Sequence, residues 1–336
     1  MIVLGIETSC DDTSAAVLEN GSNVLSNVIL DQITTHSKYG GVVPELAGRC
    51  HIESIDLVIT NALKQSKKTI NDIDLIAVTV GPGLVSSLLV GLNTAKALAF
   101  SLQIPLIGVN HLEGHLLAVF LQETVEFPYI ALTVSGGHTD IYRVDGFGSY
   151  KILGRTRDDA AGESFDKVAK MLDLGYPGGP IIEKRAKLGD PLKHQFPRAF
   201  LEKDSLDFSF SGLKTSVRNI ILKRAIGKLT NLSDNDIAAG FQEAVIDVLV
   251  NKLFLACKKE NLNRIVVTGG VAANDALRNA VAAKADLQGF NCSFPNAVLC
   301  TDNAAMIACA GYYKNKYKPA SIADTLNLDA SANLKL

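Results

Sequence analysis

The feature that most restricts the fold of this chain is an order of elements that occurs twice. The first 30 residues contain three short strand patterns, at 2–7, 13–19 and 23–30, and an Asn20-Gly21 turn separates the last two. Residues 129–154 repeat this order with the strand patterns YIALTV, TDIYRV and YKILG. The two sets of hairpins indicate an internal duplication.

Each half continues in the same way after its hairpins. Helical patterns lead to a buried apolar strand that ends in glycines, at 74–83 and at 264–274. A chain of 336 residues is also long enough for two domains. We therefore predict an α/β fold of two duplicated lobes around a central cleft, each lobe a mixed sheet flanked by helices. The predicted lobes are 1–128 and 129–336, and the second carries a helical insert at about 180–230.

The composition is typical of a folded cytoplasmic protein. A hydrophobic fraction of 47% and a charged fraction of 20% argue against disorder. The six cysteines show no CxxC spacing, which favours reduced thiols over a disulfide framework or a zinc ribbon. The N-terminus lacks the pattern of a signal peptide. The apolar stretch 81–100 contains Lys96 and a Gly-Pro-Gly turn, so we expect a buried helix there, and no membrane span.

Three turns rich in glycine or hydroxyl residues follow apolar strands, at 7–14, 134–139 and 268–274. Backbone amides at such turns can hold a phosphate, and glycine lets the backbone approach the anion closely. None of the turns matches a P-loop or a GxGxxG motif. A single turn of this kind is more simply interpreted as a chain reversal, but three at equivalent places favour a nucleotide site.

The segment His111-Leu-Glu-Gly-His115 places two imidazoles one helical turn apart, where they can chelate a divalent metal. Glu113 lies about 200° around the helix from His111, so the general base of a zinc peptidase is missing. Spacing alone leaves open that the pair are plain helix polar groups. Asp302, expected between a strand at 297–300 and a helix, is a candidate third ligand or a simple N-cap. Two histidines and one carboxylate would suit iron(II) or zinc.

The expected insert is strongly basic although the whole chain has a net charge of -2. Residues 184–228 contain eleven basic and four acidic side chains, a local charge of +7. This pattern predicts a surface that contacts an RNA backbone, with a solvated helix face as the alternative. The basic residues are Lys184, Arg185, Lys187, Lys193, Arg198, Lys203, Lys214, Arg218, Lys223, Arg224 and Lys228.

Ten stretches, taken in order, closely resemble the bacterial tRNA adenosine threonylcarbamoyltransferase family, formerly described as O-sialoglycoprotein endopeptidases. They are GIETSCDDTSAAV, GGVVPELAGRCH, GPGLVSSLLVGL, NHLEGHLLA, TVSGGHT, DDAAGESFDKVAK, YPGGP, FSFSGLKT, TGGVAAN and TDNAAM. The resemblance extends over nearly the full length. It implies a duplicated actin-like/Hsp70-like ATPase fold, in agreement with the two predicted lobes.

The resemblance also implies a metal site and a substrate site. It makes His111, His115 and Asp302 the ligands of one divalent metal per subunit, with Fe(2+) favoured and Zn(2+) as the alternative. Two positions depart from the family pattern, Asp12 in place of glutamate and Thr133 in place of the archaeal metal-binding tyrosine, so water or substrate would fill a fourth metal position. The implied substrate-binding residues are Val134, Ser135, Gly136, Gly137, His138, Asp166, Gly179, Glu183 and Asn274.

The activity implied by the resemblance is transfer of a threonylcarbamoyl group from threonylcarbamoyl adenylate to the exocyclic amine of adenosine 37 in tRNA, with release of AMP. A smaller inactive paralogue and a P-loop ATPase are the implied partners. Our candidate for the proton acceptor is Asp11, on the N-terminal turn, with Asp12 and Glu7 as alternatives. A small-molecule kinase of the same fold and a non-catalytic scaffold are the competing functions.

Overall fold

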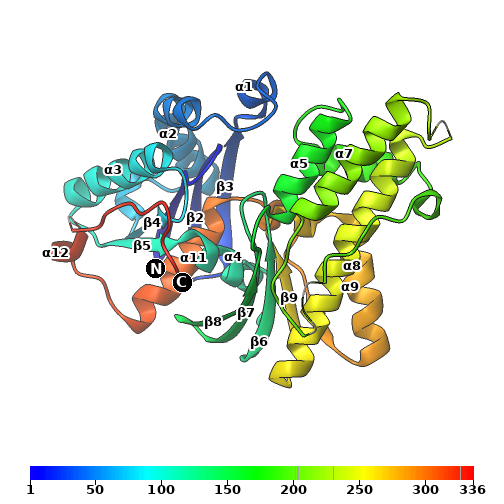
Figure 1. Cartoon of the computed structure of the whole chain (residues 1–336). Coiled ribbons are helices and arrows are strands. Elements are labelled where there is room, and N and C mark those ends of the chain that lie inside the picture. Colours follow the sequence, from blue (N-terminus) through cyan, green and yellow to red (C-terminus); the bar gives the residue numbers. More distant parts are fainter. Residues whose placement is uncertain (201, 203, 230, 326) are drawn as a thin grey trace. The chain divides into compact units, whose positions relative to one another are not determined.

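The computed structural model describes residues 1–200, 202, 204–229, 231–325 and 327–336, which form two compact units (Figure 1). Unit 1 contains Met1–Val125 and Val298–Leu336, and unit 2 contains Glu126–Ala297. The expected boundary after residue 128 therefore lies close to the observed one. The expected assignment of all C-terminal residues to the second lobe differs from the structure, because the last segment packs with unit 1.

Unit 1 is built on a five-stranded sheet with the order β3-β2-β1-β4-β5. The three N-terminal strands pair antiparallel, and β4 and β5 add in parallel, as the pattern of hairpins followed by buried strands predicts. Its elements are β1 (Ile2–Glu7), β2 (Asp12–Glu19), β3 (Asn23–Asp31), α1 (Ile33–Ser37), α2 (Pro44–Ser66), η1 (Ile70–Asp72), β4 (Leu75–Gly81), α3 (Val85–Leu102), β5 (Leu106–Asn110), α4 (His111–Leu117), η2 (Ala118–Leu121), α11 (Ala304–Tyr317) and α12 (Ile322–Thr325).

Helices cover both faces of the sheet in unit 1. Leu4 and Ile6 of β1 belong to a core cluster with residues of α2 and α3. Gly5 points to the opposite face because side chains alternate along a strand. There α11 lies against β1, and a Cβ on Gly5 would collide with the Ala304 carbonyl oxygen. This close approach of α11, whose residues Ala304–Gly311 are all buried, explains why the C-terminal segment belongs to unit 1.

Helix α3 confirms the helix expected near 81–100 but is not fully buried. By length and composition it is the one helix of the described chain that could cross a membrane, and 33% of its residues are buried. One face, including Leu88 and Leu92, packs in the unit, whereas Val85 and Phe100 are exposed.

Unit 2 repeats the sheet of unit 1 with the order β10-β9-β6-β7-β8. Helix α8 packs on α6 and on α9, and the rings of Phe165 and Phe241 join α5 to α8 edge to face. The elements of unit 2 are β6 (Tyr129–Val134), β7 (Thr139–Gly146), β8 (Ser149–Arg155), α5 (Ala161–Met171), α6 (Gly178–Ala186), η3 (Pro191–Lys193), α7 (Ser211–Ala225), α8 (Asp234–Glu260), β9 (Arg264–Thr268), η4 (Gly270–Ala273), α9 (Asp275–Gln288) and β10 (Asn291–Ser293).

The segment before Asp302 does not form the expected strand. Ala297–Cys300 is a short helix, α10, and the last strand of unit 2 is Asn291–Ser293. A run of four apolar residues is too short for its periodicity to separate a strand from a buried helical turn. The helix expected after Asp302 is α11, and Asn303, rather than Asp302, caps it by accepting a hydrogen bond from the Met306 amide.

Candidate functional site

The two histidines of the HxxxH segment lie at the carboxyl end of the unit 1 sheet. Strand β5 ends at Asn110, and α4 begins at His111. The Asn110 side chain caps this helix by accepting a hydrogen bond from the Leu112 amide at 2.9 Å. His115 follows one turn later, and both imidazoles are buried with ring centroids 4.7 Å apart. The local sequence therefore folds the pair onto one side of a buried helix.

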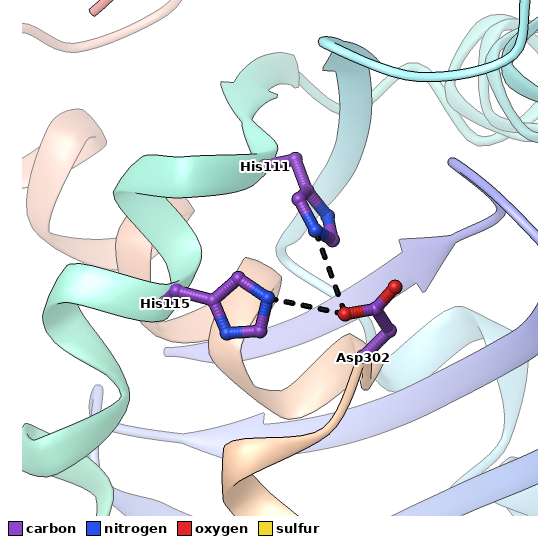
Figure 2. A group of neighbouring side chains, drawn as sticks. All are labelled: His111, His115 and Asp302. Carbon is purple, nitrogen blue, oxygen red and sulfur yellow. Dashed lines mark hydrogen bonds and ion pairs between the residues drawn. The ribbon is translucent and has the colours of Figure 1, made fainter. Parts of the chain in front are cut away.

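Asp302 completes a three-residue group with the two histidines (Figure 2). Its Oδ1 lies 3.1 Å from His115 Nε2 and 3.5 Å from His111 Nε2. One ligand atom from each residue lies within 4.8 Å of the others, so the group could hold a metal ion. Two imidazole nitrogens and one carboxylate oxygen are a ligand set that zinc and iron(II) accept.

The two histidines differ in their protonation. Burial lowers the pKa of His111, but the carboxylates of Asp302 and Glu7 outweigh burial and raise it to about 9. Burial lowers the pKa of His115, and its hydrogen bond to Asp302 offsets only part of this effect. In the metal-free protein at pH 7, the His111 ring is therefore positively charged, with both nitrogens protonated, and the His115 ring is neutral. A metal ion at this group would therefore replace one proton.

Glu7 lies against His111, and the sequence did not predict this contact. From the sequence, Glu7 is only an alternative to Asp11 as the proton acceptor. The Glu7 Oε2 atom lies 3.1 Å from His111 Nδ1, and the Thr79 hydroxyl donates to the same oxygen at 2.6 Å. The signal available in the sequence was a carboxylate at the end of an otherwise apolar, buried strand, since such a group needs partners.

The turn between β1 and β2 is acidic. Asp11 and Asp12 are both half-buried there. Burial, followed by the charges of Asp302 and Asp11, raises the pKa of Asp12 to about 8. His51 holds the start of this turn by donating from Nε2 to the Cys10 carbonyl at 2.9 Å. Asp11 thus lies in the same unit as the His-His-Asp group. The backbone just before it is held by the hydrogen bond from His51, a residue of α2.

The Ser-Gly-Gly-His segment forms a closed turn after Val134 in unit 2. The Ser135 amide donates to the His138 carbonyl at 2.8 Å, and the His138 amide donates to the Ser135 hydroxyl at 3.1 Å. Around the Cα atoms of Gly136 and Gly137 there is open space where a Cβ would stand. The sequence expectation of a turn with accessible backbone is therefore confirmed.

The start of α5 supports this turn directly. The Gly162 amide donates to the Ser135 carbonyl at 3.2 Å, and the Ala161 amide donates to the Thr139 hydroxyl at 2.9 Å. A Cβ on Gly162 would lie 2.5 Å from the Ser135 carbonyl oxygen and 2.9 Å from the Gly136 Cα. Only glycine allows this approach, so α5 and the turn are packed as one piece.

Asp166 and Gly179 lie where α5 meets α6. The Asp166 carboxylate accepts a hydrogen bond from the Gly178 amide at 2.7 Å, at the start of α6. Gly179 follows in the first turn of that helix, with open space at its Cβ position. The structure therefore connects these two expected residues to the Ser-Gly-Gly-His turn through α5.

Asn274 lies at the start of α9, and Glu183 reaches the same place from α6. Asn274 caps this helix by accepting from the Leu277 amide at 3.0 Å, and its side-chain amide donates to Gln242 at 2.9 Å. Glu183 accepts a hydrogen bond from the Asp275 amide at 3.0 Å. Both expected residues thus already stabilise a helix start, and unit 2 brings them to the same place.

Ion pairs reduce the basic surface predicted for unit 2. Lys187, Lys193, Arg198, Lys214 and Arg224 pair with carboxylates of the unit. Lys203 lies outside the described residues. Five basic residues remain exposed and form no ion pair within the described chain: Lys184, Arg185, Arg218, Lys223 and Lys228.

Two solved structures share the fold. The full-length HypF structure in its phosphate- and nucleotide-bound form matches with a TM-score of 0.61 and 15% identity, over 95% of this chain and 47% of HypF. The ADPNP-bound activator of 2-hydroxyisocaproyl-CoA dehydratase from Clostridium difficile matches with a TM-score of 0.55 and 14% identity, over 94% of this chain and 96% of the activator. At these identities the likeness concerns the fold alone, and it confirms the predicted actin-like ATPase architecture.

Sequence relatives are much closer. The family model for tRNA N6-adenosine threonylcarbamoyltransferase matches residues 23–309. A protein of that name from Thermodesulfovibrio yellowstonii is 56% identical over 100% of both chains. Another from Clostridioides difficile is 52% identical over 100% of this chain and 98% of the relative. With its full-length identity, its fold and its His-His-Asp group, this chain belongs to the tRNA N6-adenosine threonylcarbamoyltransferase family.

Proposed function

We propose that this chain transfers a threonylcarbamoyl group to the exocyclic amine of the adenosine at position 37 of tRNA. The observation that carries the proposal is 56% identity over the whole chain to a relative named for this transfer. The buried HxxxH pair and the half-buried Asp302, grouped in unit 1, support a transferase whose site includes a metal ion.

The donor in this proposal is threonylcarbamoyl adenylate. The adenine N6 attacks the carbamoyl carbon, the bond from that carbon to the phosphate oxygen breaks, and AMP leaves. The attacking amine must lose one proton. Asp11 is the proposed acceptor, because Asp12, with a pKa of about 8, holds a proton near neutral pH, and Glu7 is buried against His111.

Unit 2 would hold the adenylate part of the donor. The turn from Val134 to His138 offers accessible backbone at two glycines, which suits a phosphate. Asp166, Glu183 and Asn274 already bond to helix starts, so their proposed role is to shape this surface and place its amides. Gly179 leaves room for the ligand at the start of α6.

The metal proposed for unit 1 is one divalent ion, Fe(2+) with Zn(2+) as the alternative, held by His111, His115 and Asp302. When bound, such an ion acts as a Lewis acid toward oxygens of the donor. The protein's own contribution is a rigid frame: α4 fixes both rings, and the start of α11 fixes the segment that carries Asp302.

The tRNA would be bound in part by the five exposed basic residues on α6, α7 and the segment that follows α7. Unpaired cations of this kind contact phosphates without reading sequence. The proposed partners are a smaller inactive paralogue and a P-loop ATPase. The proposed location is the cytoplasm, as suits an enzyme that acts on tRNA.

The proposal is tested by mass spectrometry of nucleosides from tRNA incubated with the chain, both partners and threonylcarbamoyl adenylate. Threonylcarbamoyladenosine is expected with the wild-type chain, and a loss of at least 100-fold is expected for His111→Ala/His115→Ala, since removal of both imidazoles exceeds the roughly 10–100-fold effect of losing one outer support. His194→Ala is the matched control, because this histidine lies in unit 2 against Phe196, outside the group. Absence of the product with the wild-type chain and active partners would contradict the transferase function, and equal product from both chains would remove the histidines from it.

A further inference from the structure

Glu7 is a carboxylate in a place where carboxylates are rare. It ends β1, a strand that is otherwise apolar, and its exposed fraction is 0%. A buried carboxylate is costly unless it is paired and hydrogen-bonded. Glu7 is not among the three side chains that could hold the metal ion, so its presence requires another explanation.

Both oxygens of Glu7 are fixed by neighbours in unit 1. Oε1 accepts from the Ser9 amide at 2.5 Å, and Oε2 accepts from the Thr79 hydroxyl at 2.6 Å. Oε2 also faces His111 Nδ1 at 3.1 Å. Both carboxylate oxygens thus accept hydrogen bonds from fixed donors, as an ionised carboxylate does, and the side chain has one orientation.

This orientation determines what His111 can do. An ionised carboxylate accepts hydrogen bonds, so the nitrogen that faces it, Nδ1, carries the ring proton. The other nitrogen, Nε2, lies on the side of Asp302, 3.5 Å from Oδ1, and it is this nitrogen that loses its proton and offers a lone pair when a metal ion binds. Metal-binding histidines commonly have such a support, and it strengthens them as ligands.

His115 has no equivalent support. Its Nδ1 is buried and has no hydrogen-bond partner among the described residues, although its Nε2 lies 3.1 Å from Asp302. The two histidines are therefore unequal. The His111 ring has the Glu7 carboxylate and the Ser9 hydroxyl at Nδ1, each 3.1 Å away, whereas the His115 ring is held by packing and by Asp302.

We propose that Glu7 is a positioning residue for the metal, which holds His111 with Nε2 toward the ion, and that Thr79 in turn holds Glu7. The inference rests on the metal site of the proposed function. His111 is then the preorganised ligand of the pair, and metal affinity depends on a carboxylate that does not touch the ion.

The test is the equilibrium affinity of the metal-free, full-length chain for Zn²⁺, measured in competition with a chromophoric chelator. Glu7→Gln keeps the size of the side chain but removes its charge, and we expect binding about 10–100-fold weaker. Glu113→Gln is the matched control. Glu113 is a second buried carboxyl group on α4, two residues after His111 in the sequence, but it lies outside the metal group, so its loss should leave the affinity within about threefold.

A second pair of variants keeps the test valid if Glu7→Gln folds poorly. Thr79→Val removes the hydroxyl that holds Glu7 and should weaken Zn²⁺ binding, whereas Thr79→Ser retains the hydroxyl and should restore it. The absorption spectrum of the Co²⁺-loaded chain should change in Glu7→Gln and Thr79→Val but not in Thr79→Ser. Wild-type affinity in both Glu7→Gln and Thr79→Val would overturn the inference. Failure of the wild-type chain to bind Zn²⁺, Fe²⁺ or Co²⁺ at all would instead refute the metal site of the proposed function.

Discussion

Units 1 and 2 share one sheet plan but carry different groups where their central parallel strands end. In unit 1, Glu7 ends β1 and Thr79 lies two residues before the end of β4, and the Thr79 hydroxyl donates a hydrogen bond to Glu7 at 2.6 Å. In unit 2, Thr133 of β6 pairs in register with Thr268 of β9. The hydroxyls of these two threonines are buried and have no hydrogen-bond partner among the described residues.

The turns after β1 and β6 also differ in their polar groups, since only the turn of unit 1 contains carboxylates. The turn of unit 1 contains Asp11 and Asp12, and the His-His-Asp group lies in the same unit. The turn of unit 2, from Ser135 to His138, contains two glycines and no carboxylate. One backbone plan thus carries negative charge in unit 1, which suits a cation, and exposed glycine backbone in unit 2, which suits an anion. In the proposed function the two units differ through a few residues near strand ends, because their sheet plan is the same.

The largest effect expected from this comparison is that of Gly162→Ala in unit 2. The added Cβ meets backbone atoms of Ser135 and Gly136, so the turn must shift. Overpacking of this kind costs about 1–3 kcal/mol, which corresponds to roughly 5–150-fold in donor affinity. The Michaelis constant for threonylcarbamoyl adenylate should rise while Zn²⁺ affinity stays unchanged.

Gly146→Ala serves as its control, because a Cβ at that position in β7 meets no atom within 4 Å. If Gly162→Ala weakened metal binding as strongly as donor binding, the division of roles between the units would be wrong.

An effect of about the same size in free energy, but of opposite sign at the two sites, should appear at two buried threonines. Thr79→Val removes a partner of the Glu7 carboxylate and should destabilise the metal-free chain by about 1–3 kcal/mol. Thr133→Val removes a buried hydroxyl that has no partner among the described residues, and should be neutral or stabilise by up to about 1 kcal/mol. Urea unfolding of both variants measures the difference. Equal destabilisation by the two substitutions would contradict the contrast between the strand ends.

A further expected effect is a pH dependence of stability that comes from Asp12 in the acidic turn of unit 1. Burial and the neighbouring carboxylates of Asp302, Asp11, Asp31 and Glu7 raise the pKa of Asp12 to about 8 in the folded state. An unfolded aspartate has a pKa of about 3.9, so between these values the folded chain binds the extra proton and loses stability as the pH rises.

Asp12→Asn should therefore raise the melting temperature of the metal-free chain at pH 8, by about 2–4 °C for each kcal/mol of repulsion removed, with little effect at pH 4. Differential scanning calorimetry at the two pH values measures this. A gain of the same size at both would show that the charge of Asp12 is not its cause.

Much of the fold follows from local patterns. The hairpins of both halves are marked by alternating strands and by turns such as Asn20-Gly21, and the parallel strands are marked by continuous apolar runs. The packing of α11 on the sheet of unit 1 was not predictable in this way. It depends on a close approach between Gly5 and Ala304, which are remote in sequence. The helix at 297–300 was missed because four residues show no clear period.

The residues of the candidate site also divide into those that local sequence predicts and those that only the fold brings together. His111 and His115 come from a single helical turn, so their spacing alone places them on one face. Asp302 needed the family resemblance in addition, since an aspartate before a helix is also a common cap. Glu7 and Thr79 are brought together only by the register of β1 against β4. No local sequence pattern encodes that register, so the contact of Glu7 with His111 could not be predicted from the sequence.

The metal content of the purified chain, measured by elemental analysis after dialysis against trace divalent metal, tests most directly whether unit 1 holds the ion. We expect one ion per chain for the wild type and none for His111→Ala/His115→Ala, while Gly162→Ala in unit 2 retains one. An equal metal content in the wild type and the double variant would contradict the assignment of the ion to unit 1.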